Sequence, residues 1–177
     1  MSVRPPVTAI AAADLDDGIA REGSLPWRLP SDLKRFRRLT MGDGRSAVIM
    51  GRLTFMAPEV AGRPLPRRLN VVLSRQPAPA DLAPGVVWAP DWEAALAACA
   101  GVEAIWVVGG GEVYADAFAR DLVDAVELTR VHASFGCDRF WPGLPAARFA
   151  QVAAETREDG GLTVTDERWE RVRPDAP

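Results

Sequence analysis

The chain has 177 residues, of which 48% are hydrophobic and 25% charged, enough for one globular domain with a sizeable core. The formal net charge of −3 argues against a nucleic acid as partner. No apolar run reaches the length of a bilayer span, and the 15 Gly and 15 Pro follow no period, which excludes membrane-spanning and fibrous sequence. We expect a single domain over residues 1–177.

The two cysteines and the first apolar run indicate a cytoplasmic protein. Cys99 and Cys137 lie far apart and form no C-x-x-C pair, so we expect free thiols in a reducing compartment. The apolar run over residues 7–13 follows Pro5-Pro6 and is closed by Asp14, which fits a buried strand better than a signal peptide. Nothing in the sequence indicates an interface, so we expect a monomer.

Strand-like and helix-like segments alternate along the chain. In the first half we expect a strand over residues 7–13, a loop over 14–29, a helix from Pro30-Ser31 to about Thr40, a strand over 46–50, a short helix over 51–58 and a strand over 69–73. In the second half we expect strands over 86–89, 104–108 and 125–131, a helix capped by Asp91 that ends before Gly101, and a helix over 111–119.

Continuous apolar strands separated by helices indicate a parallel sheet with both faces covered. The C-terminus differs, because residues 149–158 and 162–170 flank the turn Asp159-Gly160-Gly161 and should pair as an antiparallel hairpin. The expected fold is therefore α/β with three layers: a mostly parallel central sheet of about eight strands, an antiparallel C-terminal hairpin, and helices on both faces. Ligands of such sheets bind outside the carboxyl ends of the strands.

Asp32 is the acid of the helix over residues 31–40, and it lies beside Leu33, Phe36 and Thr40 on the apolar side. One interpretation is that Asp32 only complements the helix dipole. The bulky residues of the preceding loop, 23–30, favour another: a desolvated carboxyl that accepts the paired N–H donors of a ligand such as a 2-amino-4-oxo pterin. Its raised pKa would suit proton delivery to a ring nitrogen.

Three strand ends carry groups that suit a phosphate-rich cofactor. They are Gly51-Arg52-Leu53-Thr54, Ser74-Arg75 after Leu73, and Gly109-Gly110-Gly111-Glu112-Val113-Tyr114 after Val108. Arginines at neighbouring strand ends suggest a cofactor with an additional 2′-phosphate. The glycine run is not the G-x-G-x-x-G fingerprint, because Tyr114 occupies its last position.

From about Val7 to about Glu170, the order and spacing of the motifs resemble the dihydrofolate reductase family. The matching residues are Ile10-Ala11-Ala12, Leu25-Pro26-Trp27, Asp32 with Phe36, Met50-Gly51-Arg52-x-Thr54, Arg63-Pro64-Leu65-Pro66-x-Arg68, Gly109-Gly110-Gly111-x-x-Tyr114 and Thr129. The resemblance implies NADPH-dependent reduction of 7,8-dihydrofolate to tetrahydrofolate, with protonation at N5, in one-carbon metabolism. It also implies that antifolates bind in the same pocket.

The resemblance implies a role for each matched substrate residue. Asp32 would hold the amino and ring N–H edge of the pterin with help from Thr129, and Arg68 would pair with the α-carboxylate of the glutamate tail. Leu25 and Trp27 would belong to a mobile catalytic loop that closes over the nicotinamide. The full substrate set is Ile10, Ala11, Asp32, Leu33, Phe36, Arg37, Arg63, Leu65, Arg68, Val108, Tyr114 and Thr129.

The cofactor residues follow from the same resemblance. Thr54, Gly110 and Gly111 would hold the pyrophosphate, and Arg52 and Arg75 the 2′-phosphate. The full cofactor set is Ala12, Ile19, Ala20, Gly51, Arg52, Leu53, Thr54, Leu73, Ser74, Arg75, Val108, Gly109, Gly110, Gly111, Glu112, Val113 and Tyr114. We expect no metal site, and we interpret His132, the only histidine, as structural.

Three positions depart from the family pattern: Ala20 and Arg67 stand where glycine is usual, and Glu112 stands where a basic residue can occur. Two alternatives remain open at this point. One is a related NADPH-dependent reductase of a pyrimidine riboside in riboflavin synthesis, whose substrate has no glutamate tail for Arg68. The other is a non-catalytic folate-binding homologue.

Overall fold

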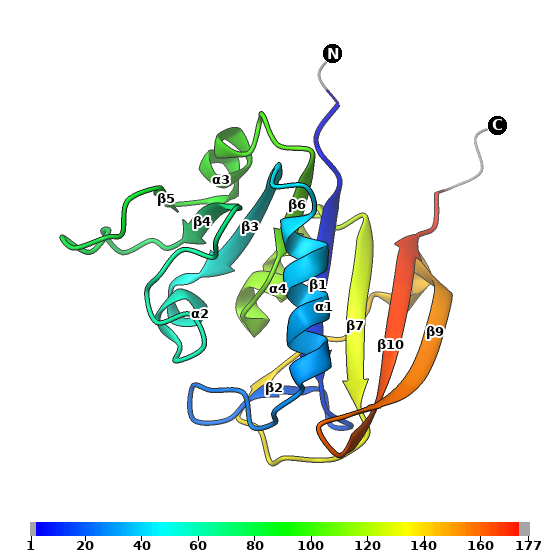
Figure 1. Cartoon of the computed structure of the whole chain (residues 1–177). Helices are drawn as coiled ribbons and strands as arrows, with labels where there is room; N and C mark the ends of the chain where they lie inside the picture. Colours follow the sequence, from blue (N-terminus) through cyan, green and yellow to red (C-terminus); the bar gives the residue numbers. More distant parts are fainter. Residues whose placement is uncertain (1–2, 174–177) are drawn as a thin grey trace.

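Eight strands form the central sheet of the computed structural model, which describes residues 3–173 (Figure 1). Their order across the sheet is β5-β4-β3-β6-β1-β7-β10-β9. The strands are β1 (Val7–Ala13), β3 (Ser46–Gly51), β4 (Leu69–Leu73), β5 (Val86–Ala89), β6 (Ala104–Val107), β7 (Ala125–Val131), β9 (Phe149–Asp159) and β10 (Leu162–Arg171). Every pairing from β5 to β7 is parallel, whereas β10 pairs antiparallel with both β7 and β9. The expected mostly parallel sheet with an antiparallel hairpin is confirmed.

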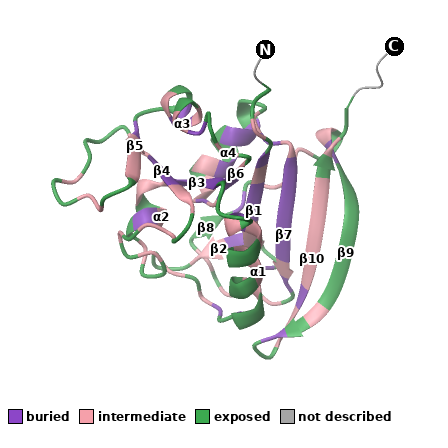
Figure 2. Cartoon of the chain, turned by 45° about the horizontal axis from the view of Figure 1, so that its top comes forward, coloured by how far each residue is buried: buried purple, intermediate pink, exposed green. Residues whose placement is uncertain are grey.

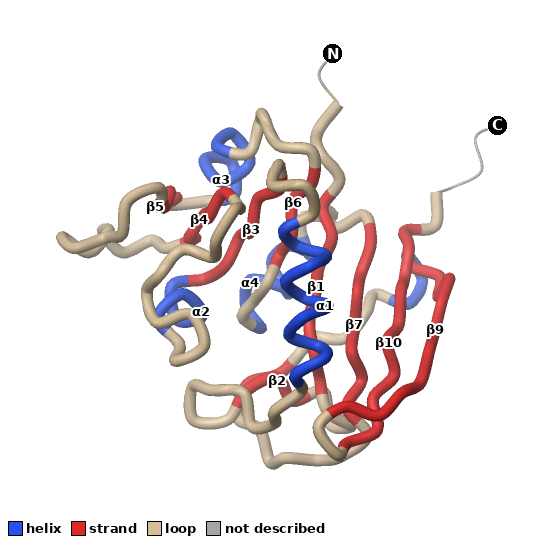
Figure 3. Tube along the Cα trace, viewed as in Figure 1, coloured by secondary structure: helices blue, strands red, loops and turns tan. Residues whose placement is uncertain are grey.

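The helices cover both faces of the sheet, as expected (Figure 3). Helices α1 (Pro30–Met41) and α2 (Arg52–Met56) place Phe36 and Phe55 in a core cluster with Ile10 and Met50. Helices α3 (Trp92–Ala98) and α4 (Gly111–Ala119) contribute Trp92, Tyr114 and Phe118 to the cluster on the opposite face. Burial is greatest in the central strands and least in the edge strand β9 (Figure 2).

The segment over residues 14–29, expected to be a loop, contains the short strand β2 (Gly18–Ala20). It pairs with β8 (Arg139–Phe140) in a separate two-stranded sheet. A single-turn 3₁₀ helix over Ala146–Arg148 was also not expected. Strands of three and two residues show no hydrophobic period, so the sequence pattern gives no signal for them. The buried carboxylate of Asp14 holds this region together, because it accepts hydrogen bonds from the amides of Gly18 and Phe135 at 2.8 and 3.0 Å.

The helices lie where the sequence analysis expected them, although α2 is shorter than expected, Arg52–Met56 instead of residues 51–58, and the start of α1 bears on function. Asp91 caps α3 as expected, with its Oδ1 accepting a hydrogen bond from the Ala94 amide at 2.8 Å. Helix α1 has no side-chain cap of its own at Leu29. Instead Asp159, at the end of β9, accepts hydrogen bonds from the amides of Ser31 and Asp32 at 3.1 and 2.8 Å. Asp159 thus accepts the hydrogen bonds of the first amides of α1 from outside the helix, so Asp32 is not needed as a cap.

None of the helices within residues 3–173 has the length and apolar character needed to cross a membrane.

We predict that Asp159→Ala lowers the free energy of unfolding more than Asp91→Ala does. Loss of a helix cap typically lowers stability by about 1 kcal/mol and by up to about 2 kcal/mol. The larger loss is expected for Asp159, because its side chain is only 2% exposed and accepts hydrogen bonds from two backbone amides. Asp91 is exposed and accepts a hydrogen bond from one amide. Urea denaturation of both variants measures the difference. Equal losses would contradict the importance assigned to Asp159.

Candidate active site

The expected ligand-binding segments meet at one edge of the sheet. Because β4, β3, β6, β1 and β7 are parallel, their carboxyl ends all lie there, and the residues that follow them come together. The N-terminal turn of α1 lies at the same edge, next to β2 (Figure 1). The strand ends on which the sequence argument rests therefore share one edge of the sheet, as expected.

Asp32 contacts Thr129 across this edge. The Thr129 hydroxyl, on β7, donates a hydrogen bond to Oδ1 of Asp32 at 2.6 Å. The Asp32 side chain is 18% exposed, and burial raises the pKa of its carboxyl, while the hydrogen bond from Thr129 opposes that rise. A carboxyl that is anchored at one oxygen and whose pKa is raised by burial can accept donors from a ligand when ionised and supply a proton when protonated.

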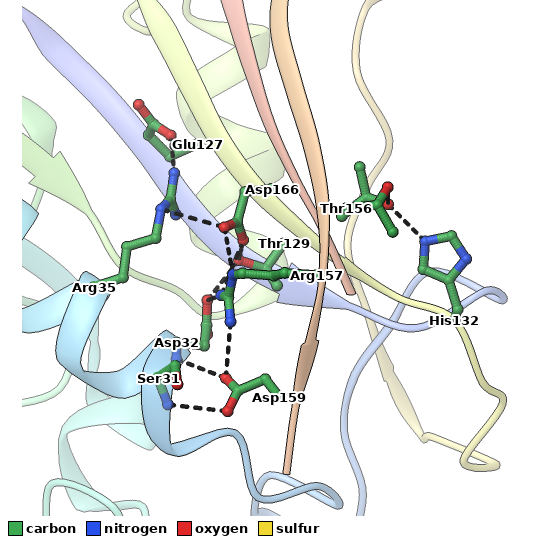
Figure 4. A network of polar contacts seen from close by, with 11 residues as sticks. Ser31, Asp32, Arg35, Glu127, Thr129, His132, Thr156, Arg157, Asp159 and Asp166 are labelled. Atoms are coloured by element: carbon green, nitrogen blue, oxygen red, sulfur yellow. Dashed lines mark hydrogen bonds and ion pairs between the residues drawn. The ribbon is translucent and has the colours of Figure 1, made fainter. Parts of the chain in front are cut away.

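Charged side chains of the C-terminal hairpin surround Asp32, and the sequence analysis did not identify them. Arg157 on β9 and Asp166 on β10 lie beside it, together with Asp159 (Figure 4). The nearest approach of Arg157 to Asp32 is 3.8 Å, between Nη2 and Oδ1. Sequence patterns could not find these residues, because they lie about 125 to 135 positions from Asp32 along the chain and show no motif.

Four of the residues expected to line the substrate pocket share one apolar cluster. Phe36, Leu65 and Val108 pack against the buried cluster that contains Ile10. Leu33, on the next position of α1 after Asp32, is 54% exposed. Ala11 is half-buried on β1 and faces the opposite cluster. The structure therefore brings Ile10, Phe36, Leu65 and Val108 together and leaves Leu33 at the rim.

Arg68 is held in a fixed position near the C-terminal end of α1. Its Nη1 donates to the Thr40 hydroxyl and its Nε to the Pro66 carbonyl, both at 2.9 Å. Burial and the nearby positive charge of Arg37 lower the pKa of Arg68. Two guanidiniums that repel each other in a partly buried place form a favourable site for a carboxylate. Arg63, the third basic residue expected here, is exposed in the loop after α2.

The structure shows how the chain accommodates Arg67 at a position where glycine is usual. Arg67 has a φ of +59°, in the left-handed region that a glycine adopts without strain. A side chain there is unfavourable by about 1 kcal/mol. Arg68 nevertheless reaches Thr40, so the substitution leaves its position intact.

The glycine run after β6 lies against β3 and α2. The Gly51 amide donates to the Gly109 carbonyl at 2.8 Å, and a side chain at Gly110 would meet Oγ1 of Thr54 at 3.4 Å. Gly109 has a φ of +123°, which requires glycine. At Gly111 a Cβ would lie 2.5 Å from the Phe140 carbonyl oxygen, so this glycine admits the backbone of β8. Gly109 and Gly111 are thus required by the fold itself, whether or not the run also contacts a ligand.

Tyr114 lies behind the glycine run, where its side chain is almost wholly buried. Its hydroxyl donates to the Ile10 carbonyl at 2.6 Å, and its ring packs edge-on against Trp141. Burial raises the pKa of the phenol. Tyr114 therefore links α4 to β1 through a neutral hydroxyl, and Val113 packs beside it in the same cluster.

The remaining cofactor candidates lie at the ends of β3, β4 and α4. Arg52 is half-buried and Arg75 is exposed, on the segments that follow two adjacent strands. Leu73, at the end of β4, is half-buried. The hydroxyl oxygen of Ser74, which follows it, accepts a hydrogen bond from the Gln76 amide at 3.1 Å. Leu53 is 66% exposed, and Glu112 is exposed in the first turn of α4.

The segment expected to close over a ligand is attached at three places. Trp27 is buried and packs edge-on against Phe135, with ring centroids 5.3 Å apart, beside the half-buried Ala12. Ala20 lies in β2, where its carbonyl accepts the Asp138 amide at 3.0 Å, so this position does not require glycine. Ile19 packs against the core cluster beneath α4.

Glu59 provides the third attachment, and the sequence analysis did not find it. Its Oε1 accepts hydrogen bonds from the Ser24 hydroxyl at 2.6 Å and from the Leu25 amide at 2.7 Å. Burial opposes ionisation, but these two donors lower the pKa of Glu59. The loop after α2 thereby holds Leu25, whose side chain is 38% exposed, at the rim of the site.

Within residues 3–173, no group of three or more His, Cys, Asp or Glu side chains is arranged to hold a metal ion.

Comparisons with known proteins agree on one family. A family model described as "Dihydrofolate reductase" matches residues 6–171. Dihydrofolate reductase of Drosophila melanogaster is 39% identical over 146 residues, covering 78% of this chain and 80% of that protein. Dihydrofolate reductase type 3 of Salmonella typhimurium is 40% identical over 150 residues, covering 85% and 86%. The structure of dihydrofolate reductase from Enterococcus faecalis complexed with NADP(H) and RAB-propyl superposes with a TM-score of 0.80, at 31% identity, covering 97% of this chain and 99% of that one.

We predict that Glu59→Ala accelerates hydrogen exchange of the Leu25 amide by about tenfold or more, because a hydrogen bond to a charged group stabilises by roughly 1.5–3 kcal/mol. Amide exchange followed by NMR measures this effect. Glu93→Ala, at an exposed site on α3, is the matched control and should leave Leu25 unchanged. Unaltered protection of Leu25 in Glu59→Ala would show that Glu59 does not hold the loop.

Proposed function

This chain belongs to the dihydrofolate reductase family, and from that premise we propose that it reduces 7,8-dihydrofolate to 5,6,7,8-tetrahydrofolate with NADPH as the reductant, using the residues described above. The observation that carries the assignment of residues is the contact between Thr129 and Asp32. It supports the proposal because it holds a carboxyl, whose pKa is raised by burial, at the edge of the sheet where we propose that the ligands bind. NADPH supplies the hydride of the reaction when it is bound.

Asp32 orients the pterin. Among the described residues, its contacts with Thr129 and Arg157 both fall on Oδ1. Oδ2 and the second lone pair of Oδ1 therefore remain for the amino and ring N–H donors of the pterin, whose paired edge suits the two oxygens of a carboxylate. The apolar residues Ile10, Phe36 and Val108 supply the wall against which a flat ring packs.

Asp32 also supports protonation at N5. Reduction adds a hydride and a proton, and N5 of the ring receives the proton. Burial raises the pKa of Asp32, so a larger share of the protein holds that proton near neutral pH than an exposed aspartate would. The protonated fraction of Asp32 falls as pH rises through this pKa, so the rate of the chemical step should also fall.

Arg68 and Arg37 recognise the glutamate tail. Their mutual repulsion, together with burial, lowers the pKa of Arg68, and a bound carboxylate relieves both effects. The hydrogen bond to Thr40 aims the guanidinium before the substrate arrives. A substrate without a glutamate tail would leave this pair of charges unused, which favours a folate over a pyrimidine riboside.

The residues at the three strand ends fit NADPH. Helix α4 begins at Gly110 without a side-chain cap, so its first amides are free to meet a pyrophosphate. Thr54 lies against Gly109 and Gly110 at the same place. Arg52 and Arg75 follow adjacent strands and would hold the 2′-phosphate that distinguishes NADPH from NADH. Leu25 and Trp27 would exclude water from the nicotinamide end.

The same proposal covers the whole chain as one catalytic domain that works as a monomer in the cytoplasm. All candidate substrate and cofactor residues come from one chain, and both cysteines are free thiols. Folate analogues should compete for the pocket beside Asp32.

We predict that wild-type protein consumes NADPH on addition of dihydrofolate, turns over NADH far more slowly, and slows as pH rises. Asp32→Asn should lower the rate of the hydride step by about 10²- to 10⁴-fold near neutral pH, the usual contribution of a general acid, while the Kd for NADPH stays unchanged. Loss of NADPH absorbance in single-turnover experiments measures the rate. An unchanged rate in Asp32→Asn, or a flat pH profile into the alkaline range, would contradict the role of Asp32.

We predict that Arg68→Gln raises the KM for dihydrofolate by roughly 10- to 100-fold with little change in kcat, because it removes binding that is equal in the ground and transition states. Steady-state kinetics give both constants. Arg67→Gln, at the exposed neighbouring position, is the matched control. A dihydropterin without the glutamate tail should show no difference between wild type and Arg68→Gln, and a difference there would refute contact with the tail.

A further inference from the structure

The charged network around Asp32 extends well beyond the residues that the reaction has required so far. It joins helix α1 to strands β7, β9 and β10 on the side of Asp32 that faces the C-terminal hairpin (Figure 4). All residues of this network are at least partly buried. They are Asp32 and Arg35 on α1, Glu127 and Thr129 on β7, Arg157 and Asp159 on β9, and Asp166 and Arg168 on β10.

Arg157 is the cation nearest to Asp32, and other carboxylates hold it. Its Nε and Nη2 donate to the two oxygens of Asp166 at 2.7 and 3.2 Å, a bidentate pair. Its Nη1 donates to Oδ2 of Asp159 at 3.2 Å. Toward Asp32 it comes no closer than 3.8 Å, beyond hydrogen-bond distance. Each of the three nitrogens thus donates to Asp166 or Asp159, and at 3.8 Å Asp32 receives no hydrogen bond from the guanidinium.

The charges of the network do not balance. Four partly buried carboxyls, Asp32, Glu127, Asp159 and Asp166, face three guanidiniums, those of Arg35, Arg157 and Arg168. The exposed Glu170 adds a further carboxylate 3.1 Å from Arg168. Glu127 contacts Arg35 and Arg168, and Asp159 and Asp166 contact Arg157, with Arg35 a further 3.9 Å from Asp166. Asp32 is the carboxyl without an arginine at hydrogen-bond distance. A partly buried cluster with an excess of negative charge favours a proton on its least paired carboxyl.

We propose that Asp166 is a positioning residue of the active site, which engages Arg157 and so keeps its guanidinium from pairing with Asp32. The inference rests on the proposed function, since it concerns the carboxyl assigned to N5. Without Asp166, Arg157 would move the short distance to Asp32 and form an ion pair with it. Asp32 would then be ionised and occupied, and unable to supply a proton or to accept both pterin donors.

The position of Thr129 agrees with this separation of Asp32 from the pair formed by Arg157 and Asp166. Its hydroxyl has one proton and lies 2.6 Å from Asp32 but 3.4 Å from Asp166, so the proton goes to Asp32. Thr129 thus anchors Asp32, while Arg157 anchors Asp166. After burial, which is the largest cause, the negative charge of Asp166 raises the pKa of Asp32, whereas Thr129, Arg35 and Arg157 lower it.

Two substitutions test the proposal, with effects of opposite sign. Asp166→Asn releases Arg157 toward Asp32 and should lower the apparent pKa of the hydride-transfer pH profile by roughly one pH unit, which slows the step about tenfold above that pKa. Arg157→Gln removes the cation and should raise the apparent pKa. The double variant identifies the route: if Asp166 acts through Arg157, the effect of Asp166→Asn shrinks in the Arg157→Gln background.

A second readout does not depend on turnover. NMR titration of the Asp32 side-chain carboxyl carbon in the ligand-free protein, assigned with Asp32→Asn, should show the same two shifts in the same directions. Asp121→Asn is the matched control, because Asp121 also pairs with two arginines, Arg148 and Arg171, after the far end of α4. It should move neither the pH profile nor the Asp32 titration.

The possible outcomes separate the two hypotheses. Absence of turnover by wild-type protein with NADPH and dihydrofolate would refute the proposed function before any variant is made. With an active wild type, shifts of both variants in one direction, or no shift in the NMR titration, would refute the role of Asp166. If one variant does not fold, the sign of the other decides. An undiminished effect of Asp166→Asn in the double variant would show that Asp166 acts directly by its charge and would overturn the positioning role.

Discussion

The hydrogen bond from the Thr129 hydroxyl to Asp32 ties helix α1 to strand β7, and the proposed chemistry of the site depends on it. That chemistry needs a carboxyl at Asp32 that is desolvated but not ion-paired with an arginine. Two arrangements maintain that condition. Asp159 caps α1 from the hairpin, so Asp32 is free of the helix start, and Asp166 holds the nearby guanidinium of Arg157. A buried ion pair at Asp32 would remove the acid that the reaction requires.

The parallel sheet supplies the second constraint, because it brings the ends of distant strands to one edge. The glycine run after β6, the turn after β3 and the serine–arginine pair after β4 become neighbours there without contact along the sequence. The antiparallel hairpin of β9 and β10 extends the sheet past β7 and carries the charged groups next to Asp32. One sheet thus carries the proposed cofactor residues at one side and the proposed proton donor at the other.

Much of this could be predicted from the sequence. The order of the elements along the chain, the cap at Asp91 and the hairpin follow from periodicity and turn residues. The role proposed for Asp32 follows from its being a carboxyl beside the apolar side of a helix, and it stays a prediction. Strands β2 and β8 could not be predicted, since segments of three and two residues have no period. The glycines carried an ambiguous signal, because a glycine run fits a tight turn as well as a ligand site, and the sequence could not show that Gly111 is required by the approach of the Phe140 backbone.

The sequence by itself determined the α/β class, the family resemblance and the residue types available for the chemistry, because local patterns record which side chains each strand and helix presents. Only the tertiary structure decided which of these side chains meet. Arg157, Asp159 and Asp166 belong to the hairpin, and their charges act on Asp32 only because the sheet brings that hairpin beside α1. Electrostatic effects depend on distance through space and on burial, neither of which is a property of spacing along the chain.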